Sequence, residues 1–131
     1  MKRICRVLVV EDNDGIRDFL QALFDDEGYH IAIVGGGEQM RAALAKDRFD
    51  VALIDVTLPG PDDGFALAKL ASAAGCGVIL VTGNARHFEA VKASGHRYLL
   101  KPFRVERLLA LVSELVAAVK DCIPAARGAG G

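Results

Sequence analysis

Short apolar runs alternate with amphipathic stretches along most of the chain. The run from Val7 to Val10 and the run from Val51 to Ile54 are too short for helices and end at polar residues. Such runs are typical of strands that are buried on both faces of a parallel sheet. Between the runs, apolar residues recur at spacings of three and four, as in helices with one buried face.

The pattern predicts five strands and five helices in strict alternation. Strands are expected at Ile4 to Val10, Tyr29 to Val34, about Val51 to Asp55, Gly77 to Thr82 and Arg97 to Leu100. Helices are expected at about 16–28, 40–47, 65–74, 86–94 and 105–123. This alternation indicates an α/β fold, with right-handed crossovers that place helices on both faces of a parallel sheet.

The stretch from Asp50 to Gly60 is the most informative part of the pattern. Four apolar residues, Val51 to Ile54, lead directly into Asp55, and a proline and a glycine follow shortly afterwards. Asp55 is therefore expected at the carboxyl end of a buried strand, the edge at which open α/β sheets bind ligands. We take Asp55 as the functional centre.

Composition narrows the class of protein. The chain has 131 residues, 52% of them apolar and 25% charged, as in a single globular domain. A formal net charge of −1 gives no overall attraction to nucleic acid or to anionic lipid, and no apolar run approaches the length of a membrane span. Cys5, Cys76 and Cys122 are widely spaced without a CxxC pair, so we expect reduced thiols in a cytoplasmic protein.

Polar residues follow several of the expected strands. Glu11 and Asp12 end the first, Asp55 the third, Thr82 the fourth and Lys101 the fifth. In a parallel sheet these positions lie along one edge, beside the crevice where the strand order reverses. Clustered carboxylates need a cation or raised pKa values, and an oxygen-rich set of this kind suits Mg²⁺. Together with a lysine and a hydroxyl, the set favours phosphoryl transfer onto an aspartate.

Four motifs in this order resemble the receiver domain of two-component response regulators. They are Val9-Val10-Glu11-Asp12, the strand Asp50 to Asp55 with Leu58-Pro59-Gly60, Val81-Thr82-Gly83, and Tyr98-Leu99-Leu100-Lys101-Pro102-Phe103. The resemblance covers roughly residues 4–121. It implies a doubly wound (βα)5 fold of the flavodoxin or CheY-like type, with the five parallel strands in the order 2-1-3-4-5.

The resemblance also implies roles at the acidic end of the site. Asp55 corresponds to the phosphoacceptor, and Glu11 and Asp12 to the acidic pair that holds Mg²⁺ or Mn²⁺ together with Asp55. The backbone carbonyl of Thr57 corresponds to a further metal ligand.

Three more residues correspond to the family's switch and its phosphoryl contact. Thr82 resembles the hydroxyl that moves toward the phosphoryl group, and Tyr98 resembles the aromatic residue that follows it inward. Lys101 corresponds to the lysine that pairs with a phosphoryl oxygen. The bond from Lys101 to Pro102 is expected to be cis.

The expected partners follow from the same resemblance. The phosphoryl donor is a sensor histidine kinase or a histidine phosphotransfer protein, and the output is an unknown downstream protein. The protein catalyses only its own phosphorylation and dephosphorylation, so it is not a conventional enzyme. We expect a receiver domain at 1–123, a flexible tail at 124–131 and no output domain in this chain. It is then expected to act by binding a partner, by passing phosphoryl groups along a relay, or as part of a longer protein. It is expected to be cytoplasmic, a monomer or weak dimer, without direct contact to nucleic acid or membrane.

The sequence departs from the family pattern at three points. The loop that carries Asp62-Asp63-Gly64 is longer by about one residue, and the nineteen residues from Thr82 to Lys101 are fewer than is common. Gly83 replaces a commoner alanine. Because family members often signal through the face of the fourth helix, fifth strand and fifth helix, the shortening bears on the output more than on the chemistry.

Three alternatives remain open at this point. The chain could be a receiver-like interaction module that is never phosphorylated. It could be a small phosphohydrolase with an aspartate nucleophile, since Asp12-Asn13-Asp14 resembles the DxD of the haloacid dehalogenase family. A flavodoxin-like flavin binder shares the expected sheet, but three acids and the absence of Trp make a poor flavin pocket.

Overall fold

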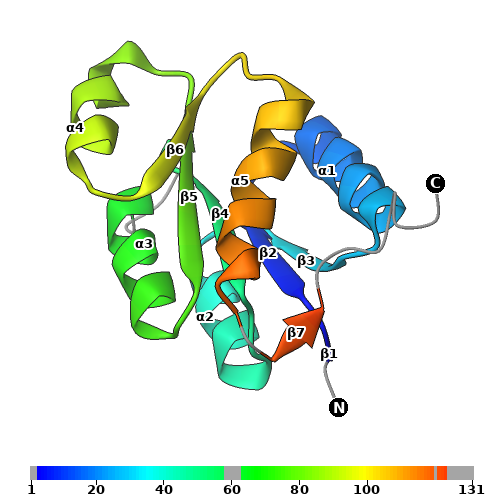
Figure 1. Cartoon of the computed structure of the whole chain (residues 1–131). Coiled ribbons are helices and arrows are strands. Elements are labelled where there is room, and N and C mark those ends of the chain that lie inside the picture. Colours follow the sequence, from blue (N-terminus) through cyan, green and yellow to red (C-terminus); the bar gives the residue numbers. More distant parts are fainter. Residues whose placement is uncertain (1–2, 58–62, 120, 124–131) are drawn as a thin grey trace.

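The computed structural model describes residues 3–57, 63–119 and 121–123 and is built on a five-stranded parallel sheet (Figure 1). The strand order, β3-β2-β4-β5-β6, is the 2-1-3-4-5 order expected from the sequence, which is confirmed. The strands of this sheet are β2 (Arg6–Val10), β3 (His30–Val34), β4 (Val51–Asp55), β5 (Gly77–Thr82) and β6 (Arg97–Leu100).

Helices cover both faces of the sheet and divide its interior into two apolar cores. The core of one face is completed by α1 (Asp14–Glu27) and α5 (Val105–Ala117), and α5 lies in front of the sheet in Figure 1. The core of the other face is completed by α2 (Gly37–Lys46), α3 (Gly64–Ala73) and α4 (Phe88–Ala93). Alternate residues of β2 supply the two cores, Val7 and Val9 the first and Leu8 and Val10 the second.

The central strand β4 sets the position of the functional edge. All five of its residues are buried, because β2 and β5 flank it and helices cover both of its faces. Asp55 pairs with Val81, one residue before the end of β5, and Ile54 pairs with Val10, the last residue of β2. Asp55 therefore lies beside Glu11 and Thr82, the residues at the carboxyl ends of the two neighbouring strands.

The first helix begins two residues before its predicted start and ends at the predicted glycine. The side chain of Asn13 accepts a hydrogen bond from the Ile16 N–H, so it caps α1 directly after the acidic motif. Gly28 ends α1 with a φ of 86°, a left-handed conformation in which glycine meets no steric penalty. The short helix expected at 86–94 is also present, as η1 (Ala85–His87) continued by α4.

The end of the fold differs from expectation. The last helix stops at Ala117 rather than near Ile123, and the N–H of Val119 bonds to the carbonyl of Val116 in a tightened final turn. Beyond α5, a two-residue strand β7 (Cys122–Ile123) pairs in parallel with β1 (Arg3–Ile4). The expected first strand is accordingly interrupted at Cys5, with β1 and β2 in different sheets.

The β1–β7 pair also corrects the expectation of reduced thiols. Cys5 and Cys122 form a disulfide, because the pairing brings their Cα atoms to 4.9 Å across a sequence separation of 117. Cys76 is buried and free, as expected. The predicted tail at 124–131 and most of the extended loop, including Asp62, lie outside the described residues. Among those that are described, no helix has the length and apolar character needed to cross a membrane.

Candidate functional site

Asp55 lies at the bottom of the site, at the end of β4, with only 6% of the residue exposed. Its Oδ1 accepts hydrogen bonds from the backbone N–H of Thr57 at 2.8 Å and from the Thr57 hydroxyl at 2.6 Å. These bonds fix the plane of the carboxylate. Its Oδ2 lies 3.3 Å from the Nζ of Lys101, so this oxygen faces a cation.

Lys101 reaches the site from the residue after β6. The Lys101 N–H bonds to the carbonyl of Thr82 at 2.8 Å, which extends the β5–β6 pairing by one residue and places the side chain over Asp55. Its Nζ also lies 3.7 Å from Oε1 of Glu11, so one ammonium group serves two buried carboxylates. The peptide bond from Lys101 to Pro102 is cis, as the resemblance implies.

The acidic pair differs in environment. Glu11 is buried, and its Oε2 accepts a hydrogen bond from the Asn13 N–H at 3.2 Å, whereas Asp12 is exposed. Burial raises the pKa of Glu11, and the charge of Asp55 adds to this, against the opposing hydrogen bond from Asn13 and the charge of Lys101. An ionised Glu11 in this position needs more positive charge than one lysine supplies.

These carboxylates fit a divalent cation. One ligand oxygen each from Glu11, Asp12 and Asp55 can be chosen so that all three lie within 4.8 Å of one another. Hard oxygen donors with one exposed, water-accessible member suit Mg²⁺, which binds few protein carboxylates and retains water ligands. A second cluster, Cys5 with Asp50 and Cys122, has similar spacing, but its two sulfur atoms are joined in the disulfide.

Thr82 ends β5 beside Asp55 and is fully buried. Its Oγ1 accepts a hydrogen bond from the Asn84 N–H at 3.1 Å, which leaves the hydroxyl proton available to an anionic oxygen. Gly83 follows it. A Cβ at this position would lie 3.3 Å from the Cβ of Lys101, so the glycine leaves room for the stem of the lysine.

Two contacts of the site were not predicted. The family resemblance implies only a backbone carbonyl ligand at Thr57, yet the Thr57 N–H and hydroxyl are the groups that hold Asp55. Asn84 holds Thr82 in the same manner. In each case the donor lies two residues after the acceptor, a spacing typical of side chains that bond to the following turn. An aspartate followed two residues later by threonine is a signal that could have indicated the first contact.

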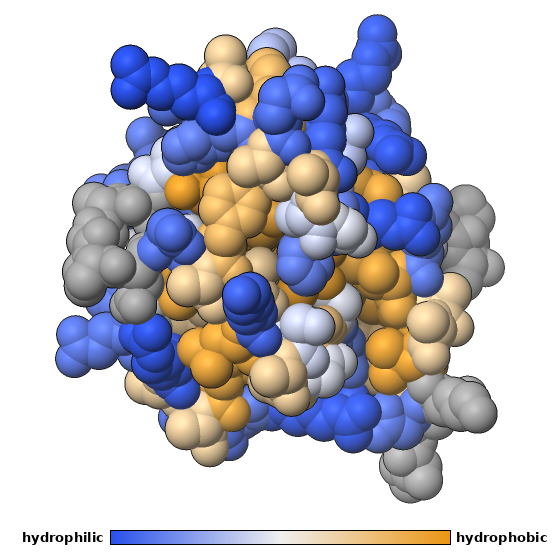
Figure 2. Space-filling view, turned by 90° about the vertical axis from the view of Figure 1, so that its left-hand side faces the viewer, coloured by the Kyte–Doolittle hydropathy of each residue, from blue (hydrophilic) through white to orange (hydrophobic). Residues whose placement is uncertain are grey.

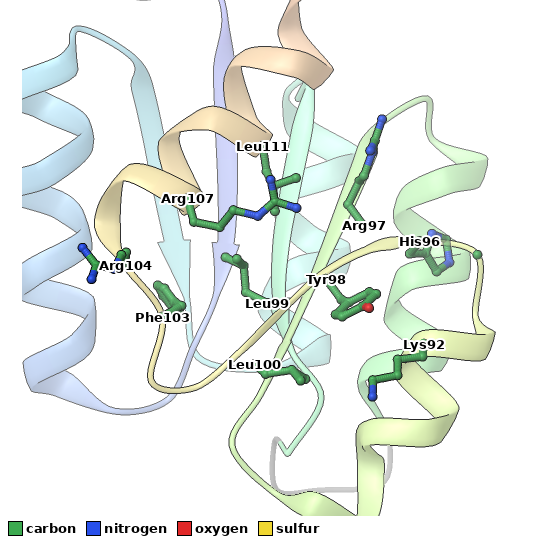
Figure 3. Close-up of a pocket in the computed structure, with 11 residues that line it drawn as sticks. Lys92, His96, Arg97, Tyr98, Leu99, Leu100, Phe103, Arg104, Arg107 and Leu111 are labelled. Carbon is green, nitrogen blue, oxygen red and sulfur yellow. The ribbon is translucent and has the colours of Figure 1, made fainter.

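Tyr98 lies outside this cluster. It lies on β6 opposite Leu80, is 37% exposed, and lines a groove of about 920 Å³ between α4, β6 and α5. In Figure 3 the Tyr98 ring lies between β6 and α4, and Arg107 extends from α5 toward the strand. Figure 2 shows the side of the molecule formed by α3 and α4, where exposed apolar patches lie between long hydrophilic side chains.

The groove is strongly basic. Lys92, Arg97, Arg104 and Arg107 line it together with the apolar Phe103. Arg97 pairs with Glu114 at 3.4 Å. Within the described part of the chain, the other three cations have no carboxylate at ion-pair distance. The groove therefore offers uncompensated positive charge around an apolar floor.

Comparison with known proteins agrees with this geometry. A sequence model of the response regulator receiver domain matches residues 7–113. The transcriptional regulatory protein AruR of Pseudomonas aeruginosa is 30% identical over 128 residues, which cover 92% of this chain and 52% of that protein. The chain thus spans about half the length of this curated relative.

Solved receiver structures share the fold. The receiver domain of the sensor histidine kinase PA1611 from Pseudomonas aeruginosa, with a magnesium ion in its active site cleft, is 26% identical with a TM-score of 0.77, covering 88% of this chain and 99% of that one. The response regulator TrrA from Thermotoga maritima, in complex with Mg²⁺ and BeF, is 25% identical with a TM-score of 0.74, covering 86% and 99%.

Proposed function

Because the chain belongs to the response regulator receiver domain family, which serves phosphorylation-based signalling, we propose that Asp55 is its phosphoacceptor. The observation that carries this proposal is the environment of the Asp55 carboxylate. It is buried, held by two donors of Thr57, and faces Lys101 across 3.3 Å beside a second acid. A carboxylate that is merely structural has no need of this arrangement at the ligand-binding edge of the sheet.

The proposed step is a transfer from a phosphohistidine. An oxygen of Asp55 attacks phosphorus, the bond from phosphorus to the donor's imidazole nitrogen breaks, and the imidazole leaves with that electron pair. The product is an acyl phosphate on Asp55. Thr57 keeps the carboxylate oriented, and the ammonium group of Lys101 can pair with a phosphoryl oxygen, so the residues act mainly by positioning and by charge.

Glu11, Asp12 and Asp55 are proposed to hold Mg²⁺ or Mn²⁺, with the carbonyl of Thr57 as a further ligand. When bound, the cation supplies charge neutralisation for the phosphoryl oxygens and for the clustered acids. The spacing of the three carboxylates supports this assignment.

Phosphorylation is proposed to bias a two-state equilibrium. The hydroxyl of Thr82, whose proton is available, donates to the new phosphoryl group in the active state. Tyr98 changes position in response, from its half-exposed site in the groove toward the interior. The groove between α4, β6 and α5 thereby reports the charge at Asp55.

A histidine kinase or histidine phosphotransfer protein is the proposed donor, and we place the protein in the cytoplasm as a monomer or weak dimer, since family members exchange phosphoryl groups there. The proposed output partner is an acidic, amphipathic protein segment that binds the groove. Uncompensated cations around Phe103 favour carboxylates combined with apolar side chains. We expect no direct binding to nucleic acid.

Intact mass spectrometry after incubation with Mg²⁺ and acetyl phosphate tests the acceptor. One added phosphoryl group is expected on the native protein, and none on Asp55→Asn or without divalent cation. Asp50→Asn is the matched control, since Asp50 is the buried aspartate directly before β4. Asp50→Asn should still be labelled.

Other outcomes select the alternatives. Failure to label, together with failure to bind beryllofluoride, would favour the interaction module that is never phosphorylated. Continuous turnover of small phosphate esters would favour the phosphohydrolase. Labelling of Asp55→Asn equal to that of the native protein would place the acceptor elsewhere.

Titration with a synthetic amphipathic peptide rich in glutamate tests the output face. The peptide should bind the beryllofluoride form more tightly than the free form, and added salt should weaken the binding. Double replacement of Arg104 and Arg107 by glutamate should abolish it, whereas Lys46→Glu on α2 should leave it unchanged. Equal binding by a glutamine version of the peptide would contradict the charge argument.

A further inference from the structure

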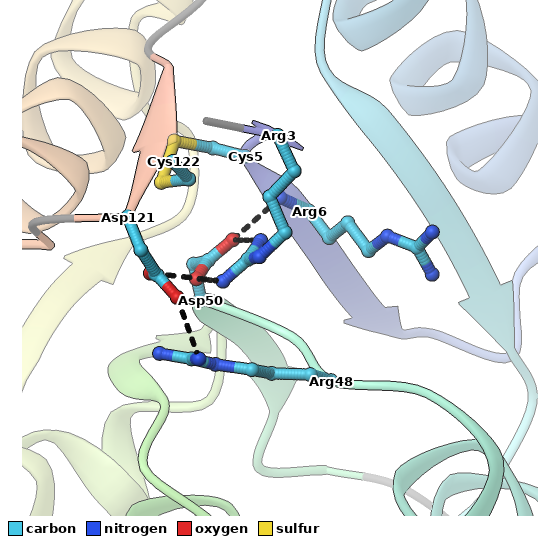
Figure 4. Close-up of a disulfide and its surroundings, with 7 residues drawn as sticks. All are labelled: Arg3, Cys5, Arg6, Arg48, Asp50, Asp121 and Cys122. Atoms are coloured by element: carbon cyan, nitrogen blue, oxygen red, sulfur yellow. Dashed lines mark hydrogen bonds and ion pairs between the residues drawn. A yellow bond between two sulfur atoms is a disulfide. The ribbon is translucent and has the colours of Figure 1, made fainter. Parts of the chain in front are cut away.

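The amino ends of the strands carry a second cluster, at the opposite edge of the sheet from Asp55. Figure 4 shows the disulfide between Cys5 and Cys122 beside the ion pairs of Asp50 and Asp121. Five residues of β2 separate Cys5 from Glu11, a span of roughly 20 Å along a strand. The cluster is therefore separate from the phosphorylation site.

Strand β1 is held to the domain independently of the disulfide. The guanidinium of Arg3 donates to both oxygens of Asp50 at 2.7 Å, and the Arg6 N–H donates to the same carboxylate at 2.7 Å. Asp50 is 2% exposed. A bidentate pair with a buried carboxylate is a strong contact.

Strand β7 has much weaker support. It contains only two residues, and its Ile123 is 44% exposed. Besides the hydrogen bonds of the two-residue pairing with β1, backbone bonds run from the Cys5 N–H to the Ile123 carbonyl at 3.0 Å and from the Arg3 N–H to the Asp121 carbonyl at 3.4 Å. Asp121 also forms ion pairs with Arg3 and Arg48, but its carboxylate is exposed, and ion pairs of exposed groups contribute little to stability. The disulfide is therefore the main restraint on this segment.

We propose that Cys5 and Cys122 form a reversible redox site that controls whether β7 is held against β1. In the oxidised form β7 stays paired with β1. In the reduced form β7 separates, while the five-stranded sheet and both of its cores persist. Of the two residues of β7, only Cys122 belongs to either core.

The chemistry is thiol–disulfide exchange with a low-molecular-weight disulfide or thiol such as glutathione. In reduction, a thiolate attacks one sulfur, the other cysteine leaves as a thiolate, and a second thiol resolves the mixed disulfide. The net change is one protein disulfide and two thiols giving two cysteine thiols and one small disulfide. Cys5 and Cys122 are 0% and 3% exposed, so separation of β7 must accompany the attack.

The proposed cytoplasmic location supports reversibility. Disulfides in that compartment are seldom permanent, and those that form there are usually redox-sensing. The third cysteine provides a contrast within the same chain. Burial raises the pKa of the Cys76 thiol to about 11, so Cys76 is a poor nucleophile and stays out of the exchange.

Alkylation of the folded native protein tests the proposal. After reduction, Cys122 should react with iodoacetamide at least about tenfold faster than Cys76, since only a separated segment exposes its thiol. When the folded protein is equilibrated with oxidised glutathione and then denatured so that its thiols can be counted, one free thiol should be found. The Cys76→Ser variant, the matched control, should lose that remaining thiol and keep the disulfide.

Either of two results would overturn the proposal. One is equal protection of Cys122 and Cys76 in the reduced folded protein, which would show that β7 stays in place without the bond. The other is three free thiols after equilibration with excess oxidised glutathione. Neither result depends on phosphorylation at Asp55, so failure here leaves the proposed function untouched.

Discussion

Asp50 and Asp55 show how two identical side chains close together in the sequence acquire different roles. Both are buried, Asp50 directly before β4 and Asp55 as its last residue. Asp50 is matched by the guanidinium of Arg3 and a backbone N–H, so its oxygens are fully engaged. Asp55 has one oxygen held by Thr57, and the other faces a lysine across 3.3 Å. The first arrangement is closed, whereas the second can accommodate a ligand.

Sequence could identify only one of these two aspartates. Asp55 follows an apolar run and precedes a turn, a local signal that places it at the ligand-binding edge. The partner of Asp50 is Arg3, 47 residues away. That contact depends on β1 turning over the start of β4, which no local pattern indicates. The contacts of Thr57 and Asn84 were missed although their signals are local.

We predict that Thr57→Val slows phosphorylation of Asp55 by acetyl phosphate about tenfold. The substitution removes the 2.6 Å hydrogen bond from the hydroxyl but keeps the backbone donor and the side-chain shape. A hydrogen bond to a charged group is worth about 1.5 kcal/mol, which corresponds to about that change in rate. Thr57→Ser should retain the native rate, measured by intact mass against time. A native rate for Thr57→Val would show that the backbone N–H alone orients the carboxylate.

Gly64 is the first residue of α3 and lies against Val56. A Cβ there would lie 2.4 Å from the Cα of Val56, which is backbone and cannot move aside. We predict that Gly64→Ala lowers the free energy of unfolding by about 2–3 kcal/mol, as overpacking does, and slows phosphorylation because Val56 adjoins Asp55.

Urea unfolding and the rate of phosphorylation check this prediction. Gly15→Ala is the control, because a Cβ at Gly15 would meet only the side chain of Asn13, at 3.4 Å. That variant should be as stable as the native protein or slightly more so, since alanine favours a helix. Native stability of Gly64→Ala would mean that the loop can shift away from Val56.

At the scale of elements, periodicity predicted the sheet and most helices well. Buried parallel strands and amphipathic helices carry strong patterns, and the order of the strands followed from the resemblance. The predicted end of α5 was wrong, because the apolar spacing of Val112, Val116 and Val119 continues past the last helical turn. Strand β7 has two residues, too few to show any period.

The amino end of β4 should make stability depend on pH. Burial alone would raise the pKa of Asp50, but the hydrogen bonds from Arg3 and Arg6 and the charges of Arg3 and Arg48 outweigh it and lower this pKa below its ordinary value of 3.8. A lowered pKa in the folded state gives stability that is complete above the ordinary value. That stability is lost as pH falls below 3.8 toward the folded pKa.

The free energy of unfolding in urea should therefore differ between the native protein and Asp50→Asn by a constant amount from neutral pH down to about pH 5. We expect this difference to be about 2 kcal/mol, from lost charge-assisted hydrogen bonds. It should shrink below about pH 4. A difference independent of pH would show that the charge of Asp50 adds nothing to the stability.

At the scale of the whole molecule, the acids of the phosphorylation site should couple cation binding to stability. Glu11, Asp12 and Asp55 repel one another in the absence of a cation. We predict that Mg²⁺ raises the melting temperature in a concentration-dependent manner. At a Mg²⁺ concentration of 100 times the dissociation constant, the free energy of unfolding should rise by about 2.7 kcal/mol. Differential scanning calorimetry with MgCl₂ and with a chelator measures this shift.

Asp12→Asn should lose most of the magnesium effect, since it removes the exposed ligand without disturbing the core. Asp26→Asn, an exposed substitution on the last turns of α1, should respond to Mg²⁺ as the native protein does. An equal rise in both variants would mean that the ion acts by general screening of acids rather than at this site.

The parallel pairing of β1 and β7 has a mechanical consequence. Tension that is applied outward at the two ends of the chain loads this pair in shear, so its backbone bonds and the disulfide resist together rather than one by one. While the bond is closed, the residues between Cys5 and Cys122, with a sequence separation of 117, cannot lengthen the tether. Reduction releases roughly 400 Å of hidden contour length, at about 3.5 Å per residue. In a force-extension trace the oxidised domain should therefore show no unfolding extension between Cys5 and Cys122, whereas the reduced domain should show the extension of an unfolding domain.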